Sequence, residues 1–241
     1  MCDTCGCGDP EVVPVEIAEK ILSQNDHRAA HNRAHFKEAG VLAINLMGSP
    51  GSGKTALLEA TSRQLRDRSG KGAKRWRIGA VSGDLATDND AARLRAADIR
   101  CEAITTGSAC HLDARLVHHA LHHMPDWQQE DIFFIENVGN LVCPAIYDLG
   151  QDANVVVLAI TEGTDKPIKY PVMFRSADLV VLSKIDLLPH LRVDISEIED
   201  ALAQVNPNPS MLTVSAETGE GVAEWIEWLE RRRTAALALV G

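Results

Sequence analysis

The chain has 241 residues, with 24 Lys and Arg against 34 Asp and Glu, so its formal net charge is −10. This acidity argues against a nucleic-acid groove, because such a groove needs a basic surface to neutralise phosphates. Hydrophobic residues make up 45%, enough for one sizeable core, which excludes disorder of the whole chain. Aromatic residues are only 4%, which favours an α/β domain over an all-β sandwich.

The amino-terminal segment concentrates half of the cysteines, Cys2, Cys5 and Cys7. It has neither the basic stretch nor the apolar segment of a secretory signal, and the longest apolar run, 155–160, is too short to span a bilayer. We therefore expect a cytoplasmic protein without membrane insertion, whose clustered thiols bind metal or exchange electrons rather than form structural disulfides. Residues 1–13 are interpreted as a flexible metal-binding tail.

Beyond the tail, helical and strand patterns alternate. Pro14 and the apolar spacing after it predict a helix that runs to about Ala39 and is stopped by Gly40. Short apolar runs predict strands at 41–47, 76–82, 101–105, 131–136, 154–160, 179–183 and 211–214. Helical periodicity predicts helices at 54–68, 90–97, 112–124, 168–175, 195–204 and 222–238. This alternation predicts a mainly parallel sheet with helices on both faces.

The strongest motif is GSPGSGKT at 48–55, which matches GxxxxGK[ST], follows a predicted strand and opens a predicted helix. Backbone N–H groups in such a loop surround phosphates at a helix N-terminus. Lys54 is expected to reach the β- and γ-phosphates, and the Thr55 hydroxyl is expected to bind Mg²⁺. The alternative is a glycine-rich turn without a ligand. The predicted nucleotide-binding residues here are Gly48, Ser49, Pro50, Gly51, Ser52, Gly53, Lys54, Thr55 and Ala56.

A second motif ends the predicted strand at 179–183. The sequence SKID at 183–186 resembles the NKxD guanine motif of GTPases, with Ser183 in place of asparagine. Asp186 would accept hydrogen bonds from guanine N1–H and the 2-amino group, donors that adenine lacks, and Lys184 would lie along the base plane. Ser215 and Ala216 resemble the last GTPase motif, whose backbone touches guanine O6. A strand-to-helix turn with a surface ion pair is the alternative, and the phosphate loop upstream favours guanine.

The hydrolytic residues depart from the usual GTPase pattern. Glu136 to Gly139 stand where the DxxG motif holds Mg²⁺ and senses the γ-phosphate. Asp84 is the other acid expected near the metal, and we prefer it to Asp88 and Asp90, which suit a helix cap. No glutamine sits beside Gly139 to orient water, so we expect slow hydrolysis that needs a partner or a second protomer. The candidate catalytic residues are Lys54, Asp84 and Glu136, and the candidate magnesium ligands are Thr55, Asp84 and Glu136.

The tail carries a first group of soft metal ligands. Cys2, Cys5 and Cys7 place three thiols in a short loop, and the α-amino group of Cys2 could fill a fourth position. A square-planar nitrogen and sulfur set suits Ni²⁺, whereas a tetrahedral set suits Zn²⁺. A redox pair or an incidental tail is the alternative reading.

A second group lies in the main domain. Cys110, His111 and Cys143 form an incomplete tetrahedral set, which implies a bound water, an exchangeable metal or ligands shared across a dimer. Because Cys143 follows the segment 136–139, we expect the nucleotide state to alter metal affinity, and reciprocity then requires metal to alter nucleotide affinity.

Several other histidines and one cysteine carry weaker signals. Spacing of four can chelate a metal but is equally typical of a solvated helix face. Cys101 lies in an apolar strand and is predicted to be a buried core thiol. The histidines concerned are His118, His119, His122 and His123 on one predicted helix, and His27, His31 and His35 on another.

Together these motifs resemble the HypB family of hydrogenase nickel-incorporation GTPases. The matching segments are MCxxCGCG, GSPGSGKT, SGDLATDNDAARL, TGSACHLDARLVHHAL, FFIENVGNLVCP and LSKIDLLP, which cover nearly the whole chain. The resemblance implies that 14–241 form a helix plus a P-loop GTPase domain of the dimerising (SIMIBI) class that includes the urease nickel chaperones. It also implies a nickel site at Cys2, Cys5 and Cys7 and a nickel or zinc site at Cys110, His111 and Cys143.

The resemblance further implies a GTP-hydrolysing nickel metallochaperone with GTP or GDP, Mg²⁺, Ni²⁺ and Zn²⁺ as its ligands. Its expected partners are a second copy of the chain, an accessory nickel protein of the HypA type and the precursor of the [NiFe] hydrogenase large subunit. The tail lacks a long histidine-rich stretch, so nickel storage is not expected. The alternatives are a urease or cobalamin-enzyme chaperone GTPase of the same class, or a nickel buffer with a regulatory nucleotide site.

Overall fold

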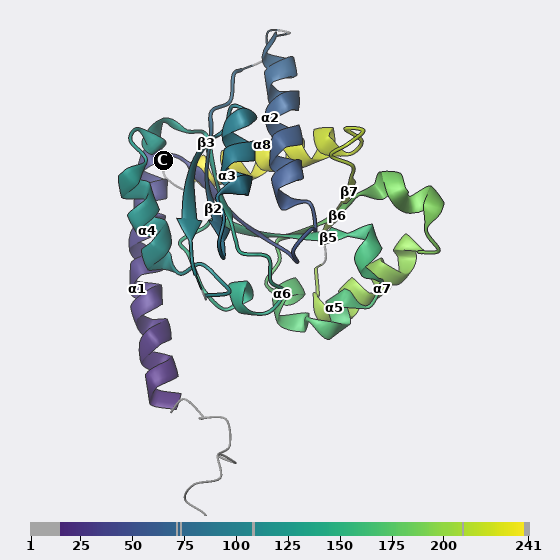
Figure 1. The fold of residues 1–241 in the computed structure, drawn as a ribbon, viewed down its shortest axis with the longest axis horizontal. Coiled ribbons are helices and arrows are strands. Elements are labelled where there is room, and N and C mark those ends of the chain that lie inside the picture. The colour runs from purple at the N-terminus through teal and green to yellow at the C-terminus, as the bar shows by residue number, and fades with distance from the viewer. Residues whose placement is uncertain (1–14, 71, 73, 108, 209, 239–241) are drawn as a thin grey trace, which may run out of the picture.

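The structure, a computed structural model, describes residues 15–70, 72, 74–107, 109–208 and 210–238. The predicted tail at 1–13, with Cys2, Cys5 and Cys7, lies outside the described residues. In the described part, seven parallel strands form one sheet in the order β3-β2-β4-β1-β5-β6-β7, which confirms the α/β class (Figure 1). The strands are β1 (Leu42–Met47), β2 (Ile78–Asp84), β3 (Arg100–Thr105), β4 (Ile132–Glu136), β5 (Ala153–Ala159), β6 (Leu179–Ser183) and β7 (Met211–Val214).

Helices connect the strands and cover the sheet. The α-helices of the described residues are α1 (Val15–Ala39), α2 (Lys54–Gly70), α3 (Asn89–Ala96), α4 (Ala114–His123), α5 (Lys166–Lys169), α6 (Pro171–Arg175), α7 (Ile195–Val205) and α8 (Val222–Ala238). Short 3₁₀ turns add η1 (Trp127–Gln129), η2 (Cys143–Ala145), η3 (Ile160–Glu162) and η4 (Ile185–His190). No helix among the described residues is long and apolar enough to cross a membrane.

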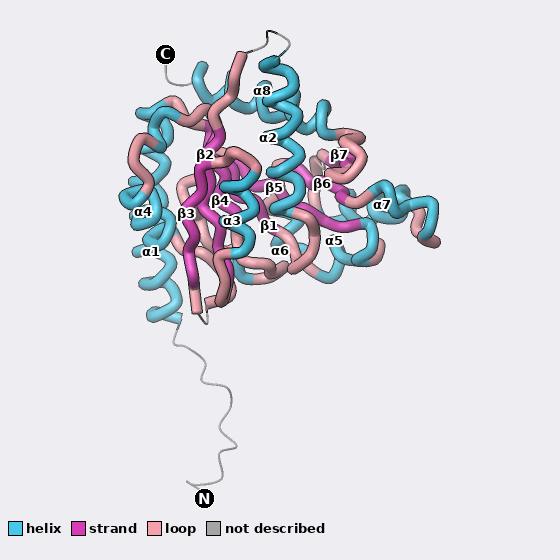
Figure 2. Tube along the Cα trace, turned by 45° about the horizontal axis from the view of Figure 1, so that its top comes forward, coloured by secondary structure: helices cyan, strands magenta, loops and turns pink. Residues whose placement is uncertain are grey.

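Both faces of the sheet are buried, because successive side chains of a strand point to opposite faces. In β5, Val155 and Val157 pack in one core with α2, α3 and α8. Val156 and Leu158 pack in the opposite core with α6 and α7. The other half of that second face is covered by α1 and α4, the pair at one side of the sheet in Figure 2. The sheet is therefore the middle layer of three, as continuous apolar strands predict.

The prediction of one helix over 168–175 is wrong. The segment forms two short helices, α5 and α6, that meet at Tyr170. Pro171 has no backbone N–H to donate to a preceding carbonyl, and its ring disfavours a helical residue before it. The apolar periodicity across 168–175 therefore spans a break rather than one helix.

Cys101 lies in β3 and is buried, as predicted. Burial is the main cause that raises the pKa of its thiol to about 12, and the negative charge of Glu136 adds to the shift. A thiol in this environment is a small core residue and not a nucleophile, because the thiolate is the reactive form.

We expect one thiol of the folded chain to resist an aromatic disulfide reagent at pH 8. With a pKa of about 12, only about one Cys101 thiol in ten thousand is ionised at that pH. Thiol counting in buffer and in denaturant checks this, with Cys101→Ala as the control that should leave no protected thiol. Rapid reaction of all six cysteines in the folded chain would contradict it.

Candidate nucleotide and metal sites

The candidate nucleotide site lies at the carboxyl edge of the sheet. The phosphate loop follows β1, Glu136 ends β4, Asp84 ends β2 and Ser183 ends β6. Parallel pairing of β1 with β4 and of β2 with β4 brings these strand ends to one edge. Ligands of open α/β sheets bind in the crevice outside the carboxyl ends of the strands, so the topology assembles residues that are far apart in sequence.

Lys54 is folded into the phosphate loop. Its Nζ donates to the carbonyl oxygens of Gly48 and Ser49 at 3.3 and 3.1 Å. Burial lowers the pKa of Lys54, and the negative charge of Glu136 acts in the opposite direction. The hydroxyls of Ser49 and Ser52 are buried without a hydrogen-bond partner among the described residues. A loop with two orphaned hydroxyls and a buried ammonium suits an anion that brings several acceptor oxygens.

Glu136 faces the phosphate loop from β4 and is only 2% exposed. Its carboxylate accepts hydrogen bonds from Thr55 Oγ1 at 2.7 Å and from Ser82 Oγ at 3.0 Å. Burial raises the pKa of Glu136, while the Thr55 hydrogen bond and then the Lys54 charge oppose that rise. A hydroxyl and a carboxylate are hard oxygen ligands, so the donor set at Thr55 and Glu136 fits Mg²⁺.

Ser82 was not among the predicted site residues. It meets Glu136 because β2 and β4 pair with Ser82 opposite Glu136. Strand register sets this contact, and nothing in the local sequence around Ser82 signals it.

Asp84 lies at the same edge, but the hydrogen bonds of its side chain stay within its own turn. Its carboxylate accepts from the Leu85 N–H and, at 2.6 Å, from the Thr87 hydroxyl. Asp88 stands at the N-cap position of α3 and makes no side-chain capping hydrogen bond. The structure therefore brings Thr55 and Glu136 into direct contact and leaves Asp84 near the edge without a hydrogen bond to either.

A cavity of about 330 Å³ continues from the phosphate loop to the end of β6. Asp186 lies in its wall, and its Oδ1 accepts a hydrogen bond from Ser215 Oγ at 2.6 Å. Lys184 has a left-handed backbone with φ of 61°, an uncommon conformation that concentrates at functional sites. The lining includes Gly53, Ala56, Ser183, Lys184, Asp186 and Ala216. A cavity of this size, with the Asp186 carboxylate in its wall, suits a planar base with adjacent donors.

Ser183 connects this cavity to the phosphate loop. Its hydroxyl donates to the Ser52 carbonyl oxygen at 2.6 Å. Ser183 is buried, and this hydrogen bond makes it a brace between β6 and the loop. The SKID string did not predict this brace, and it did not predict the role of the Ser215 hydroxyl in orienting Asp186.

The soft ligands of the main domain lie together. Cys110, His111 and Cys143 each offer one ligand atom, and these atoms all lie within 4.8 Å of one another, the one such group among the described residues. The two sulfur atoms are 3.0 Å apart. His111 stacks on Tyr147 with ring centroids 3.9 Å apart, and burial lowers the pKa of its imidazole. A neutral imidazole and two thiols form a three-ligand set for a borderline or soft metal.

Asn140 joins the phosphate loop to this ligand set. Its backbone N–H donates to the Gly48 carbonyl oxygen at 3.0 Å. Its side chain donates to the Cys110 carbonyl oxygen at 3.3 Å and accepts from the Val142 N–H at 2.8 Å. Next to it, Gly139 packs so closely on Pro50 that an added Cβ would lie 2.9 Å from the Pro50 backbone. The two candidate sites thus share one hydrogen-bonded segment.

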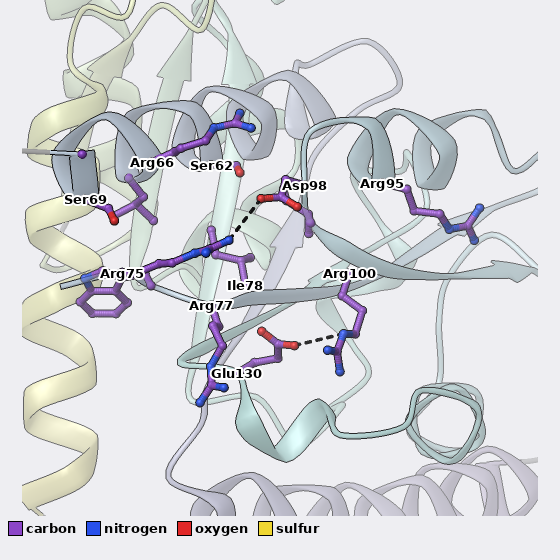
Figure 3. A pocket seen from close by; sticks show the side chains of 14 residues that line it. Ser62, Arg66, Ser69, Arg75, Arg77, Ile78, Arg95, Asp98, Arg100 and Glu130 are labelled. Atoms are coloured by element: carbon purple, nitrogen blue, oxygen red, sulfur yellow. Dashed lines mark ion pairs between the residues drawn. The ribbon is translucent and has the colours of Figure 1, made fainter.

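A larger cavity, of about 710 Å³, lies at the opposite ends of the strands (Figure 3). Its wall contains Trp76, Asp98 and Glu130, and Arg75 and Arg100 pair with the two acids at 3.8 and 3.4 Å. Because Ile78 begins β2 and Arg100 begins β3, this cavity is at the amino edge of the sheet. It is separate from the phosphate loop, and the site chemistry does not use it.

Comparisons with known proteins identify the family and a related solved structure. The family described as "CobW/HypB/UreG, nucleotide-binding domain" matches residues 42–213. The hydrogenase maturation factor HypB of Azotobacter vinelandii is 47% identical over 223 residues, which are 92% of this chain and 71% of that protein. The hydrogenase/urease maturation factor HypB of Helicobacter hepaticus is 42% identical over 91% of this chain and 88% of its own length. The crystal structure of HypB from Helicobacter pylori in complex with nickel superposes with a TM-score of 0.81 and 34% identity, covering 88% of this chain and 96% of that chain.

We expect Asp186→Asn to weaken GTP binding by roughly 100-fold or more, because the asparagine amide would place an N–H donor opposite the N1–H and 2-amino donors of guanine. Binding of xanthosine triphosphate, which carries a carbonyl in place of the 2-amino group, should improve. Titration of both nucleotides checks this, with the exposed Asp200→Asn as a matched control. Equal GTP affinity in Asp186→Asn and the wild-type chain would contradict the assignment of this cavity to guanine.

Proposed function

Because this chain belongs to the HypB family of hydrogenase maturation factors, a family of nickel-associated P-loop GTPases, we propose that it hydrolyses GTP to time nickel delivery. The recipient would be the precursor of the [NiFe] hydrogenase large subunit, reached with an accessory nickel protein of the HypA type. The observation that carries the proposal is the segment from Glu136 to Cys143, whose Asn140 bonds both the phosphate loop and the Cys110 backbone.

The nucleotide chemistry follows from the phosphate loop. On binding, the triphosphate would take Lys54 Nζ away from the two carbonyl oxygens that it now contacts, and would supply acceptors for the hydroxyls of Ser49 and Ser52. Thr55 and Glu136 would hold Mg²⁺, which neutralises developing charge on the β- and γ-phosphate oxygens. Asp186 would select guanine through the two donors that adenine lacks.

Hydrolysis by one chain alone should be slow. Asp84 is the carboxylate at the sheet edge that we propose orients the attacking water, and its present partners, Leu85 and Thr87, belong to its own turn. Repositioning of that turn by a second protomer or a partner would complete the site, as GTPases that lack a positioned water-orienting residue require. Glu136 is already engaged by two hydroxyls, so its role is to hold the metal.

The cargo would be a nickel or zinc ion held by Cys110, His111 and Cys143. Three protein ligands leave one tetrahedral position for water, for a group from a second copy or for a transfer partner. An open position allows exchange, which a delivery site requires and a permanent structural site does not. Cys2, Cys5 and Cys7 are proposed as a separate nickel site in the tail.

Nucleotide and metal would be coupled through the segment 136–143. A γ-phosphate that displaces Lys54 changes the neighbourhood of Gly48, whose carbonyl oxygen also accepts from Asn140. Movement of Asn140 shifts its side-chain partners, Cys110 and Val142, and so changes the spacing of the two thiols. By reciprocity, nickel must change GTP affinity by the same factor that GTP changes nickel affinity.

A second copy of the chain is the proposed partner for hydrolysis. Large apolar side chains stand exposed around η2, which holds Cys143, and on α5 and α6, and such a surface is where an interface would form. Val142 and Ile146 flank η2. Ala145 of η2 and Tyr170 are partly buried against the core cluster that contains residues of α6, which connects η2 with the helix that carries Val172. The exposed side chains are Val142 (52%), Ile146 (51%), Ile168 (49%) and Val172 (56%).

Asn140→Ala should uncouple nickel from nucleotide. The change removes both side-chain hydrogen bonds but leaves the backbone bond to Gly48, so GTP affinity should change less than about threefold. The nickel affinity ratio between the GTP-analogue and GDP states should fall toward one, from a coupling of ~5–150-fold in the wild-type chain. Competition titrations in both nucleotide states measure this, alongside GTP turnover with and without nickel.

Cys110→Ala and Cys143→Ala serve as ligand-removal comparators for this measurement, and the exposed Asn208→Ala serves as its matched control. If both cysteine variants kept the nickel dependence of GTP affinity, the coupling proposal would be wrong. Absence of any GTP turnover under dimerising conditions would favour the nickel-buffer alternative. Transfer of nickel to apo-urease but not to a hydrogenase precursor would favour the urease-type alternative.

The double variant Ile168→Glu/Val172→Glu should prevent the nucleotide-dependent dimer, because it places two charges in an apolar contact. With the GTP analogue and Mg²⁺, the wild-type chain should sediment as a dimer and the variant as a monomer with reduced turnover. Leu237→Glu, an exposed leucine on α8, is the control that should still dimerise. Normal dimerisation of the double variant would remove this surface from the proposal.

A further inference from the structure

Four histidines on α1 and α4 form a group that the nucleotide and thiol sites do not use. His31 and His35 lie one turn apart on α1, and His118 and His122 lie one turn apart on α4. Within each pair the two Nε2 atoms are 3.0 Å apart. The rings of His31 and His118 face each other across the two helices, with centroids 5.1 Å apart, and that of His35 is 6.0 Å from His118.

The two helices are held in a fixed register by asparagines of α1. Asn25 Oδ1 accepts from the Ala114 N–H at 2.9 Å, and Asn32 Nδ2 donates to the Ala114 carbonyl oxygen at 2.8 Å. Asn32 Nδ2 also donates to the Leu149 carbonyl oxygen at 3.1 Å. The histidine pairs are therefore mounted on a rigid framework, which a preorganised site requires.

Asn32 also sets the tautomer of His118. Both hydrogens of its amide nitrogen go to carbonyl oxygens, so its Oδ1 is an acceptor, and it lies 3.0 Å from His118 Nδ1. Nδ1 of His118 must then carry the hydrogen, which leaves a lone pair on Nε2 that faces His122. A metal-binding histidine has this arrangement, because its second nitrogen donates to a neighbouring oxygen.

The spacing of the nitrogens matches metal coordination. With metal–nitrogen bonds of ~2.0–2.1 Å, two ligands of a tetrahedral site lie about 3.3 Å apart, close to the 3.0 Å within each pair. Loss of hydration, followed by repulsion from neighbouring histidines and Arg28, lowers the pKa of His31 and of His118. The neutral form of His31 and of His118 is thereby favoured. No three of the four histidines place a nitrogen within 4.8 Å of one another in the structure, so binding of one ion by both pairs would require rotation of these exposed or half-buried side chains.

From this geometry we propose that His31, His35, His118 and His122 form an additional site for one divalent cation of the nickel and zinc type. All four ligands are imidazoles, which suit Ni²⁺ and Zn²⁺ and disfavour the softer monovalent copper that thiolates select. The site is distinct from Cys110, His111 and Cys143, which lie at the carboxyl edge of the sheet. It does not depend on GTP hydrolysis, so it stands or fails independently of the function proposed above.

The same helix supplies a matched control. His119 and His123 are also one turn apart on α4, with ring centroids 4.4 Å apart, but among the described residues the histidine rings of α1 contact His118 and neither of these two. If spacing of four were sufficient, this pair would bind metal as well as its neighbour. The proposal requires the pair that faces α1.

The test uses the full-length chain with Cys2, Cys5, Cys7, Cys110 and Cys143 replaced by serine, titrated with NiCl₂ and with ZnCl₂ against a chelator of known affinity. One ion should bind per chain. The double variants His31→Ala/His35→Ala and His118→Ala/His122→Ala should each weaken binding by more than ~100-fold, since loss of an outer partner alone costs ~10–100-fold. His119→Ala/His123→Ala should change it by less than twofold.

Two further measurements keep the result independent of folding defects. The second protein is the chain with the five cysteine-to-serine changes and all of its histidines. In its NMR spectrum, ZnCl₂ should shift the imidazole nitrogen signals of His31, His35, His118 and His122 and leave those of His119 and His123 unchanged. Arg28→Gln should strengthen binding a few-fold, because it removes a positive charge close to His31 and His118. No bound ion, equal losses in the His119/His123 variant, or an unchanged affinity in either facing-pair variant would overturn the proposal.

Discussion

The pairing of β1 with β4 is the constraint on which both candidate sites depend. It sets Leu46 of β1 opposite Glu136 of β4, so the phosphate loop begins beside the carboxylate that ends the neighbouring strand. Beyond the strands, an isolated antiparallel bridge joins Gly48 to Asn140. A phosphate loop and the loop that carries Cys143 are thereby parts of one continuous hydrogen-bonded edge.

This arrangement places opposite charges in a poorly hydrated place. Glu136 and Lys54 are both buried. Burial raises the pKa of Glu136 and lowers the pKa of Lys54, which favours the neutral form of each, and the charge of each residue opposes the pKa shift of the other. Buried charges are expensive unless they are paired and fully hydrogen-bonded. Here the hydroxyls of Thr55 and Ser82 donate hydrogen bonds to the Glu136 carboxylate. The hydroxyls of Ser49 and Ser52 have no hydrogen-bond partner among the described residues. The unmet hydrogen-bonding capacity therefore lies on the phosphate side of the site, where a ligand can meet it.

Local sequence patterns were sufficient for the seven strands and for most of the helices, although β2 runs on to Asp84 instead of ending at residue 82. The phosphate loop, the position of Glu136 and the adjacency of Cys110 and His111 can be read from short strings, because each string has its own turn chemistry. The brace from Ser183, the hydroxyl of Ser82 and the bridge made by Asn140 could not, because strand register and loop packing create those contacts. Pro171 shows the opposite case, since a local rule against helical continuity was present in the sequence and apolar periodicity concealed it.

The histidines separate spacing from placement most clearly. Two pairs on α4 have the same spacing of four, and the sequence cannot distinguish them, because the difference lies in which pair faces α1. That orientation follows from Asn25 and Asn32, which bond the first turn of α4 and fix its rotation against α1. Asn32 then uses its remaining oxygen to hold His118 Nδ1. The buried amide of Asn32 thus helps to fix the position of the helix and also fixes which nitrogen of His118 keeps its lone pair, so the tautomer of this surface histidine is determined inside the protein.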